Sequence, residues 1–374
     1  MRALSNIYRL GVKELWSLLR DPAMLVLIVY IFTAAIYIAA SAVPESINMA
    51  TIAIVDEDDS PLAKRIASAF YPPKFVRPKM VSLHEVDRGM DKDLFTFALD
   101  IPPNFQRDVL AGRKPDVQLN VDATRMSQAF VGAGYIQRMV MDEIDLFVER
   151  YRGAASLPVE LAMRMRFNPN LTRSWFGSVV ELINNITMLS IILTGAALIR
   201  EREHGTVEHL LVMPVTPLEI MLSKIWSMGV VVLAGSACSL LFIIEGALGV
   251  PIEGSVPLFL AGTALHLFAT TSMGIFLATL ARSMPQFGML LILILLPMQM
   301  LSGGSTPRES MPQIVQDLML AAPTTHFIEL GQSILYRGGD LSVVWSSFLF
   351  LAVIGGVFFA ASLARFRKTI SQMA

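Results

Sequence analysis

The sequence is short of charge and has almost no cysteine. Only 16% of its 374 residues are Asp, Glu, Lys or Arg, against about 25% in an average soluble domain, and 54% are hydrophobic. Its one cysteine, Cys238, leaves no disulfide within the chain to stabilise any part of it. A disulfide scaffold is therefore excluded, and the net charge of −1 predicts no nucleic-acid-binding face.

The chain also lacks a nucleotide-binding loop and a convincing metal-binding pattern. It has no G-x-x-x-x-G-K-[ST] motif to cradle phosphates. His204, Glu208 and His209 form H-x-x-x-E-H, one residue longer than the H-x-x-E-H spacing of zinc peptidases, with no third ligand nearby. The acids from Asp56 to Asp59 favour stabilisation of a helix N-terminus over metal binding. We predict no catalytic residue, metal site or cofactor bound by this chain.

Long apolar runs dominate the rest of the sequence. Because about 20 helical residues cross a hydrocarbon core of about 30 Å, the runs predict a polytopic α-helical membrane protein with six spans. The first run ends in Ala40-Ser41-Ala42, which resembles a signal-peptidase site, but its apolar part is too long for a cleaved signal. The expected spans are residues 23 to 43, 175 to 199, 225 to 250, 256 to 281, 286 to 302 and 341 to 364.

Basic residues in the short connections indicate the orientation. The connections on the side of the N-terminus hold eleven Lys and Arg residues, whereas the short loops on the other side hold only Arg308 and Arg337. Since cytoplasmic loops carry the excess of Lys and Arg, both termini, including the tail of residues 365 to 374, are expected in the cytoplasm.

Residues 1 to 22 have the pattern of a basic amphipathic helix that lies in the headgroup plane and contacts lipid. The alternative is a helix packed on a soluble domain. Two stripes follow helical spacing, one of Leu4, Tyr8, Gly11, Leu15 and Leu18, the other of Asn6, Arg9, Lys13, Ser17 and Arg20.

Residues 44 to 174, between the first two spans, have the pattern of a mixed α/β extracytoplasmic domain. "ATIAIVDEDDSPLAKRIASAF" predicts a strand, a turn and a helix that Ser60 caps and Pro61 begins. "LFTFALDIPPNF" predicts another strand, and the alternation in "DVQLNVD" predicts a half-buried one. Residues 127 to 151 predict a long amphipathic helix. Without a disulfide, this domain must be stabilised by its own core.

The stretch "REREHGTVEHLLVMPVTPLEIMLSK", residues 200 to 224, is unusually polar for a connection between two spans. Thr216 and Glu219 form a capping box around Pro217, so the third-span helix is predicted to begin there. Upstream, residues 205 to 213 predict a short helix with one apolar face. Such a helix suits docking into a groove on another subunit, and the alternative is an ordinary solvated loop.

This stretch resembles the hallmark cytoplasmic loop of the ABC type 2 permease family, E-x-E-x-G-T-x-E-x-L-L followed by proline, Glu and Lys. "AIVDEDDSPLAKRI" and "DIPPNFQRDVLAGRKPDVQLNVDAT" are similar to the outer domain of its drug-efflux branch. The resemblance covers nearly the whole chain. The matching positions, which the resemblance implies couple to an ATPase, are Glu201, Glu203, Gly205, Thr206, Glu208, Leu210, Leu211, Pro214, Glu219 and Lys224.

The resemblance implies a membrane subunit of a bacterial inner-membrane exporter. Its loop helix would dock in a cleft of a separate ATPase subunit that holds ATP and Mg²⁺. It would work as a dimer with a second copy or a related permease. The large periplasmic domain would meet a periplasmic membrane-fusion adaptor.

The last outer loop, residues 303 to 340, is rich in Gly and Pro and contains two amphipathic pieces. These pieces are expected at the outer membrane surface or dipping into it. Residues 301 to 305, "LSGGS", resemble the LSGGQ signature of ABC ATPases, but they follow an apolar span on the outer side. The ATPase is therefore not expected in this chain.

Polar residues within the spans are candidates for a substrate path, because a charge at the centre of a membrane helix costs about 2.5–3.5 kcal/mol. They would form a polar vestibule for a cationic or amphipathic substrate. Alternatively, the carboxylates snorkel to the interface and the histidine bonds to a neighbouring helix. The candidates are Glu181, Asn184, Asn185, Glu245 and His266.

Two functions remain open from the sequence. One is export of a drug-like substrate, which polar residues along the spans favour. The other is a membrane sensor or mechanotransmitter that passes no substrate, which a dry and tightly packed dimer seam would favour.

Overall fold

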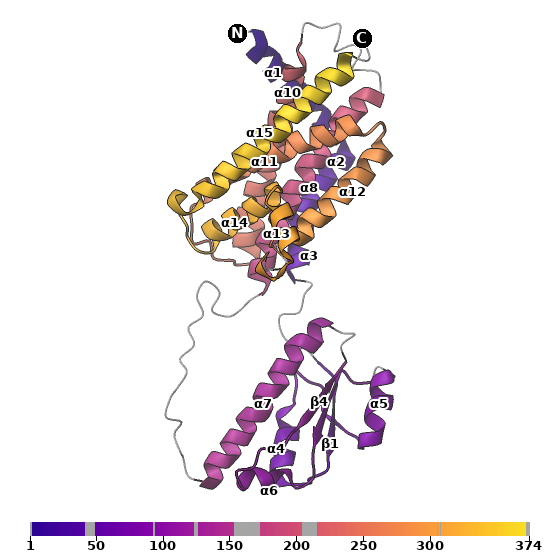
Figure 1. Ribbon diagram of the computed structural model, residues 1–374, viewed down its shortest axis with the longest axis vertical. Coiled ribbons are helices and arrows are strands. Elements are labelled where there is room, and N and C mark those ends of the chain that lie inside the picture. The colour runs from indigo at the N-terminus through magenta and orange to yellow at the C-terminus, as the bar shows by residue number, and fades with distance from the viewer. Residues whose placement is uncertain are drawn as a thin grey trace. The chain divides into compact units, whose positions relative to one another are not determined.

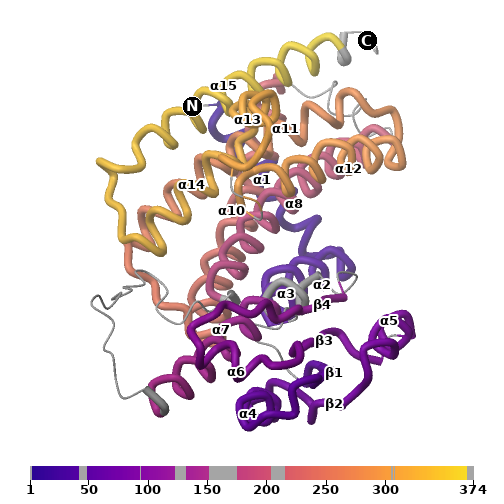
Figure 2. The backbone as a smooth tube through the Cα atoms, turned by 60° about the horizontal axis from the view of Figure 1, so that its bottom comes forward, coloured from indigo at the N-terminus to yellow at the C-terminus, as the bar shows by residue number. Residues whose placement is uncertain are grey.

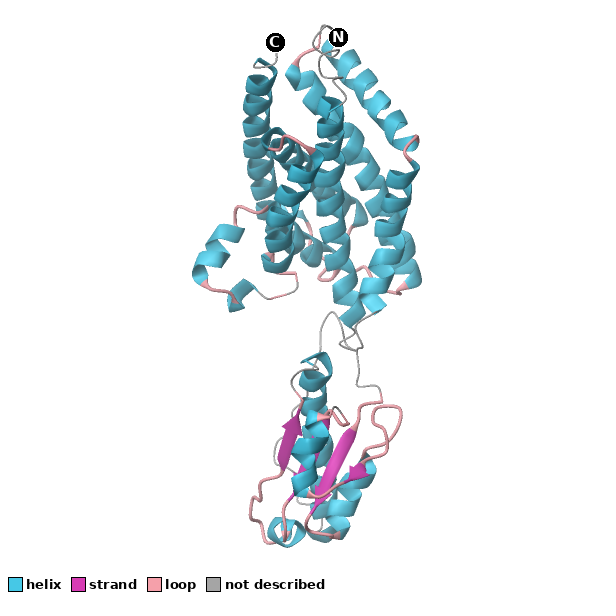
Figure 3. Ribbon diagram, turned by 90° about the vertical axis from the view of Figure 1, so that its right-hand side faces the viewer, coloured by secondary structure: helices cyan, strands magenta, loops and turns pink. Residues whose placement is uncertain are grey.

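The computed structural model describes residues 2–41, 49–92, 94–122, 126–152, 173–203, 215–304, 306 and 308–371. The chain divides into two compact units. One, helical, combines Met1–Val43 with Met165–Ala374, and the other, Pro44–Arg164, contains the sheet (Figure 3). The α/β unit is therefore inserted between the first two long helices of the helical unit.

The helical unit contains, among the described residues, six helical stretches long and apolar enough to cross a membrane. This confirms the predicted polytopic α-helical class with an additional α/β domain. The two termini lie at the same end of this unit (Figure 1). The stretches are α2 to α3 (Pro22–Tyr30, η1 Ile31–Ala35, Ile36–Ser41), α8 (Arg173–Glu203), α10 with η2 (Pro217–Cys238, Ser239–Ala247), α11 (Val256–Leu280), α12 (Met284–Leu301) and α15 (Leu341–Ser371).

Helix α8 is the most buried of the six and packs against α3, α10, α11 and α12. Its contact with α11 is close, because a Cβ on Gly274 would lie 2.4 Å from Thr194 Oγ1. Hydroxyl groups bridge the same interface, where Ser190 Oγ donates to Thr270 Oγ1 over 2.6 Å. Figure 2 shows α8 running alongside α10 and α12. The centre of the bundle is thus closely packed and partly polar.

The two amphipathic pieces of the last outer loop are buried to different extents. After η3 (Arg308–Ser310), α13 (Gln313–Met319) buries only Met319, as a surface helix does. In contrast, α14 (Pro323–Leu335) is buried along nearly its whole length and packs on α8, α11 and α15. Phe327 stacks on Phe259 of α11, and Gly331 leaves room for Ile183 of α8. The amphipathic pattern of α14 did not reveal this, because polar residues such as Thr324, Thr325 and His326 are also buried between helices.

The N-terminal helix α1 (Arg2–Leu19) forms as predicted and packs on α10. It ends before Asp21, whose side chain accepts a hydrogen bond from Met24 N over 3.1 Å and so caps α2 at Pro22. The apolar stripe expected for lipid is divided, because Gly11 is buried against α10 whereas Leu4 is exposed.

The α/β unit has a four-stranded sheet in the order β2-β1-β3-β4. β1 is parallel to β2 and β3, and β4 is antiparallel to β3. Alternate residues face opposite sides, so that Ile54 packs under α4, α6 and α7 and Val55 packs under α5. The elements are β1 (Ile52–Asp56), α4 (Pro61–Ala69), β2 (Lys79–Met80), α5 (Leu83–Asp91), β3 (Phe97–Ile101), α6 (Phe105–Leu110), β4 (Gln118–Val121) and α7 (Met126–Arg152).

Local signals in this unit are confirmed. The three strands predicted from pattern correspond to β1, β3 and β4, and Ser60 Oγ caps α4 by accepting from Ala63 N over 3.2 Å. The acidic turn also binds backbone: Asp56 Oδ1 accepts from Asp59 N, and Asp58 Oδ2 accepts from Gln106 N in the first turn of α6. These carboxylates therefore stabilise a turn and a helix start.

Candidate functional site

The polar stretch of residues 200 to 224 is helical at both of its ends. Residues 200–203 continue α8, and residues 217–224 already belong to α10. The helix of the third span thus begins at Pro217, as predicted, and the helix of the second span continues past the apolar run that ends at residue 199. The following candidate coupling residues lie outside the described residues: Gly205, Thr206, Glu208, Leu210, Leu211 and Pro214.

The start of α10 is the capping box predicted from the sequence. Thr216 Oγ1 accepts from Glu219 N over 3.3 Å, and Glu219 Oε2 accepts from Thr216 N over 2.8 Å. Pro217 occupies the first helical position, where a missing N–H costs nothing. Glu219 is thus held by the backbone of its own helix start.

Lys224 lies one turn further along α10 and joins three helices. Its Nζ is 2.8 Å from Glu201 Oε2 on α8 and 3.0 Å from Glu14 Oε1 on α1. The lysine side chain is 1% exposed and the two carboxylates are 11% and 13% exposed. A buried ammonium shared by two carboxylates therefore connects the end of α8, the start of α10 and the N-terminal helix.

Four consecutive charged residues at the end of α8 each bind a different part of the unit. Besides Glu201, Arg200 pairs with Asp21 before α2 over 3.2 Å. Arg202 Nη1 donates to the carbonyls at the end of α11, over 3.1 Å and 2.9 Å. Glu203 Oε1 accepts from Met284 N at the start of α12 over 2.9 Å. The end of α8 is consequently joined to α1, α10, α11, α12 and the residue that caps α2.

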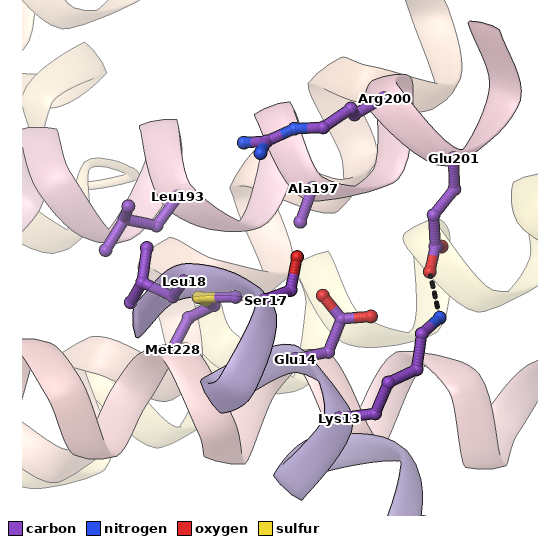
Figure 4. Close-up of a pocket in the computed structure, with 9 residues that line it drawn as sticks. All are labelled: Lys13, Glu14, Ser17, Leu18, Leu193, Ala197, Arg200, Glu201 and Met228. Carbon is purple, nitrogen blue, oxygen red and sulfur yellow. Dashed lines mark hydrogen bonds and ion pairs between the residues drawn. The ribbon is translucent and has the colours of Figure 1, made fainter. Parts of the chain in front are cut away.

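The electrostatics of the Lys224 cluster depend on Glu14. Burial raises the pKa of the Glu14 carboxyl, and the neighbouring Glu201 raises it further, whereas Lys224 opposes the shift. Lys13 adds a second ammonium 3.5 Å from Glu201 Oε1 (Figure 4). Because buried charges are tolerated only when paired, removal of Lys224 would leave two carboxylates without their shared partner.

Helix α1 is held on α10 by Trp226 as well. The Trp226 Nε1–H donates to Ile7 O over 3.1 Å, and its ring stacks on Tyr8. A Cβ on Gly11 would lie 2.2 Å from the same indole, so glycine is required for this approach. The ion cluster and this contact together position α1 against the start of α10.

Glu14 is a site residue that sequence reasoning did not identify. It lies on the buried face of α1, between Gly11 and Leu18. The one indication in the sequence is that Glu14 is an acidic residue within an otherwise basic amphipathic helix. Its ion pair with Lys224 could be predicted only if the packing of α1 on α10 were known.

The candidate substrate-path residues have different surroundings. His266 is buried, with Nε2 2.8 Å from Thr187 Oγ1 on α8 and its ring stacked on Phe327. Asn185 is also buried, and its Nδ2 donates to Ile31 O over 3.2 Å. Their contacts match the expectation of polar groups that join neighbouring helices.

The other three candidates differ in exposure. Glu245 is exposed on η2, and Glu181 is half-buried on α8. The Asn184 Oδ1 atom is buried, and within the described part of the chain it has no hydrogen-bond partner. Among the described residues, His266 Nδ1 is likewise buried without a hydrogen-bond partner, so Asn184 and His266 are the candidates with an unpaired polar atom within a span.

Comparison with known proteins identifies the family. The model of the "ABC-2 family transporter protein" family matches residues 23–364. This chain belongs to the ABC-2 transporter family. The permease is 63% identical over 374 residues to the inner membrane transport permease YhhJ of Escherichia coli (strain K12), with 100% of each chain covered.

Two more distant relatives also align with nearly the whole chain. The permease is 29% identical over 366 residues to the probable multidrug ABC transporter permease YbhR of Escherichia coli (strain K12), covering 96% of this chain and 97% of the relative. It is 24% identical over 356 residues to YbhS of the same strain, another probable multidrug ABC transporter permease, covering 91% and 90%. The permease is thus a multi-pass inner-membrane subunit of an ABC transporter, a family that implies a separate ATPase partner.

Proposed function

We propose that this permease exports a drug-like, cationic or amphipathic substrate across the bacterial inner membrane, powered by a separate ATPase subunit. Both termini lie in the cytoplasm in this proposal, and the Pro44–Arg164 unit lies in the periplasm. The names of YbhR and YbhS support the substrate class. The observation that carries the coupling role is the Lys224 cluster, which joins the two helices on either side of the connecting loop.

Coupling requires that a change at the loop reaches the spans. A nucleotide can shift the permease between two states only through interactions that differ between those states. Residues 204 to 216 connect α8 to α10 in the sequence, and the two helix ends on either side of them are joined to each other by Lys224 and Glu201. A displacement of the loop therefore moves α8 and α10 together, and Glu14 makes α1 move with them.

The partners follow from the same scheme. The ATPase subunit holds ATP and Mg²⁺ and performs the hydrolysis, and this chain supplies no catalytic residue. A second permease copy or a related permease completes the transport path. The Pro44–Arg164 unit meets a periplasmic membrane-fusion adaptor.

Export is favoured over pure force transmission by the names of YbhR and YbhS, both probable multidrug ABC transporter permeases. The hydroxyl groups inside the bundle do not decide between the two functions, because Ser190, Thr270 and Ser362 are buried and bonded between helices, as in closely packed membrane bundles.

Reversal of one charge in the loop tests the coupling role. Glu208→Lys should leave the permease inserted in the membrane but abolish copurification of its ATPase and export of amphipathic cations. Glu57→Lys, at an exposed position of the α/β unit, is the matched charge-reversal control and should retain both. If Glu208→Lys also retains both, the docking assignment is wrong.

A further inference from the structure

A cleft of about 280 Å³ lies between α1 and α8, beside the Lys224 cluster (Figure 4). Its interior is apolar and is formed by Leu18 of α1, Leu193 and Ala197 of α8 and Met228 of α10. Charged side chains from α1 and α8 surround this interior, including Lys13 and Arg200. The cleft therefore offers an apolar slot next to cationic groups.

The charges around the cleft are unequally exposed. Lys13 and Arg200 are 55% and 40% exposed, whereas Glu14 and Glu201 are 11% and 13% exposed and share the buried Lys224. Lys13 pairs with Glu201 and Arg200 pairs with Asp21, but both cationic side chains keep a large part of their surface exposed, whereas the carboxylates Glu14 and Glu201 do not. The accessible edge of the cleft is consequently suited to an anion.

The surroundings of the cleft are suited to lipid. Helix α1 leaves an apolar face uncovered, in a chain whose neighbouring helices span a membrane, and a basic stripe runs beside that face. A membrane-surface helix with this pattern binds the boundary between headgroups and acyl chains. The exposed apolar residues are Leu4, Tyr8, Trp16 and Leu19, and the basic ones are Arg2, Arg9, Lys13 and Arg20.

We propose that the cleft between α1 and α8 binds an anionic phospholipid, with its phosphate between Lys13 and Arg200 and part of one acyl chain in the apolar interior. The volume of the cleft accommodates a segment of a chain, and the rest of the lipid lies against the exposed face of α1. The phosphate competes with Glu201 for Lys13 and with Asp21 for Arg200. On the proposed function, bound lipid would then loosen α1 from the end of α8 and change the coupling.

Lipid retention by the full-length permease tests the site without any transport assay. Purified permease is mixed with phosphatidylglycerol or phosphatidylcholine, and retained lipid is counted by native mass spectrometry. The double variant Lys13→Gln/Arg200→Gln should weaken phosphatidylglycerol retention about 25-fold, because each basic residue near an anionic lipid contributes about fivefold. The control Arg77→Gln/Lys79→Gln removes the same charge from exposed positions of the α/β unit and should retain phosphatidylglycerol like the wild type.

A second variant keeps every charge. Ser17→Trp places an indole at the exposed edge of the cleft, where Ser17 lines it, and should also reduce phosphatidylglycerol retention. Equal retention by the wild type and both cleft variants would overturn the proposal, and so would equal retention of the two lipids by the wild type. Displacement of the lipid by inorganic phosphate alone would assign the site to a free anion instead. Because no step measures export, failure here leaves the proposed function untouched.

Discussion

Lys224 Nζ lies 2.8 Å from Glu201 Oε2, so a buried ion pair joins the first turns of α10 to the last turn of α8. The two residues are 23 positions apart in the sequence and enclose the whole connecting loop. A segment docked on another subunit must be rigidly connected to the spans if its displacement is to move them. The Lys224–Glu201 ion pair provides this connection, and the Lys224–Glu14 ion pair extends it to α1.

Replacement of Lys224 should be strongly destabilising. Lys224→Met leaves Glu14 and Glu201 buried without their shared ammonium, and loss of one member of a buried ion cluster costs about 3–5 kcal/mol. We expect a lower thermal unfolding temperature for the purified permease. Lys13→Met is the control, because Lys13 is 55% exposed and an exposed ion pair contributes at most about 1 kcal/mol. Equal losses in the two variants would contradict a special role for Lys224.

The stability of the permease should depend on pH through Glu14. Burial raises the pKa of Glu14 above its ordinary value of 4.5, so its protonated form favours the folded state. That contribution is complete below the ordinary pKa and is lost as the pH rises through the folded-state pKa. Glu14→Gln cannot ionise and avoids this loss. The unfolding temperature of Glu14→Gln should therefore rise relative to that of the wild type as the pH increases from below 4.5 through the folded-state pKa, and a constant difference would contradict the assignment.

The close approach of α1 to α10 should tolerate no side chain at Gly11. A methyl group there would lie 2.2 Å from the Trp226 indole, and overpacking of this kind costs about 1–3 kcal/mol. Gly229→Ala on α10 is the matched control, since nothing lies within 4 Å of its added Cβ and alanine is the better helix former. Amide hydrogen exchange in α1 should be faster than in the wild type for Gly11→Ala and unchanged for Gly229→Ala. Unchanged exchange would show that α1 does not depend on this contact.

The two span carboxylates should differ in their effect on export. Glu181 is half-buried on α8, whereas Glu245 is exposed on η2. If Glu181 lines a vestibule for cations, Glu181→Gln reduces export of amphipathic cations at normal expression and Glu245→Gln leaves it unchanged. Measured efflux of several cations decides the matter. Unchanged export of all of them by Glu181→Gln would remove the vestibule.

The elements with strong local signals could be predicted from the sequence. The spans follow from apolar length, and the start of α10 follows from Thr216, Pro217 and Glu219. The strands β1, β3 and β4 follow from their pattern and flanking turns. In contrast, β2 has only two residues and leaves no detectable periodicity.

Features that depend on packing between distant segments were not predictable. The burial of α14 requires knowledge of which helices accept its small residues, and a single sequence carries no such information. Two members of the Lys224 cluster could be identified from the sequence, because Lys224 and Glu201 match the family pattern. Its third member, Glu14, lies 210 positions from Lys224 and becomes relevant only once α1 packs on α10.

The end of α8 connects several helices, since Arg200, Arg202 and Glu203 contact three further elements beyond the Lys224 cluster. A force applied to the end of α8 is therefore distributed over these elements, so a rearrangement of the bundle is collective. Because several contacts act in parallel, loss of one of the three contacts made by Arg200, Arg202 and Glu203 should slow the transport cycle, whereas loss of two or more should arrest it.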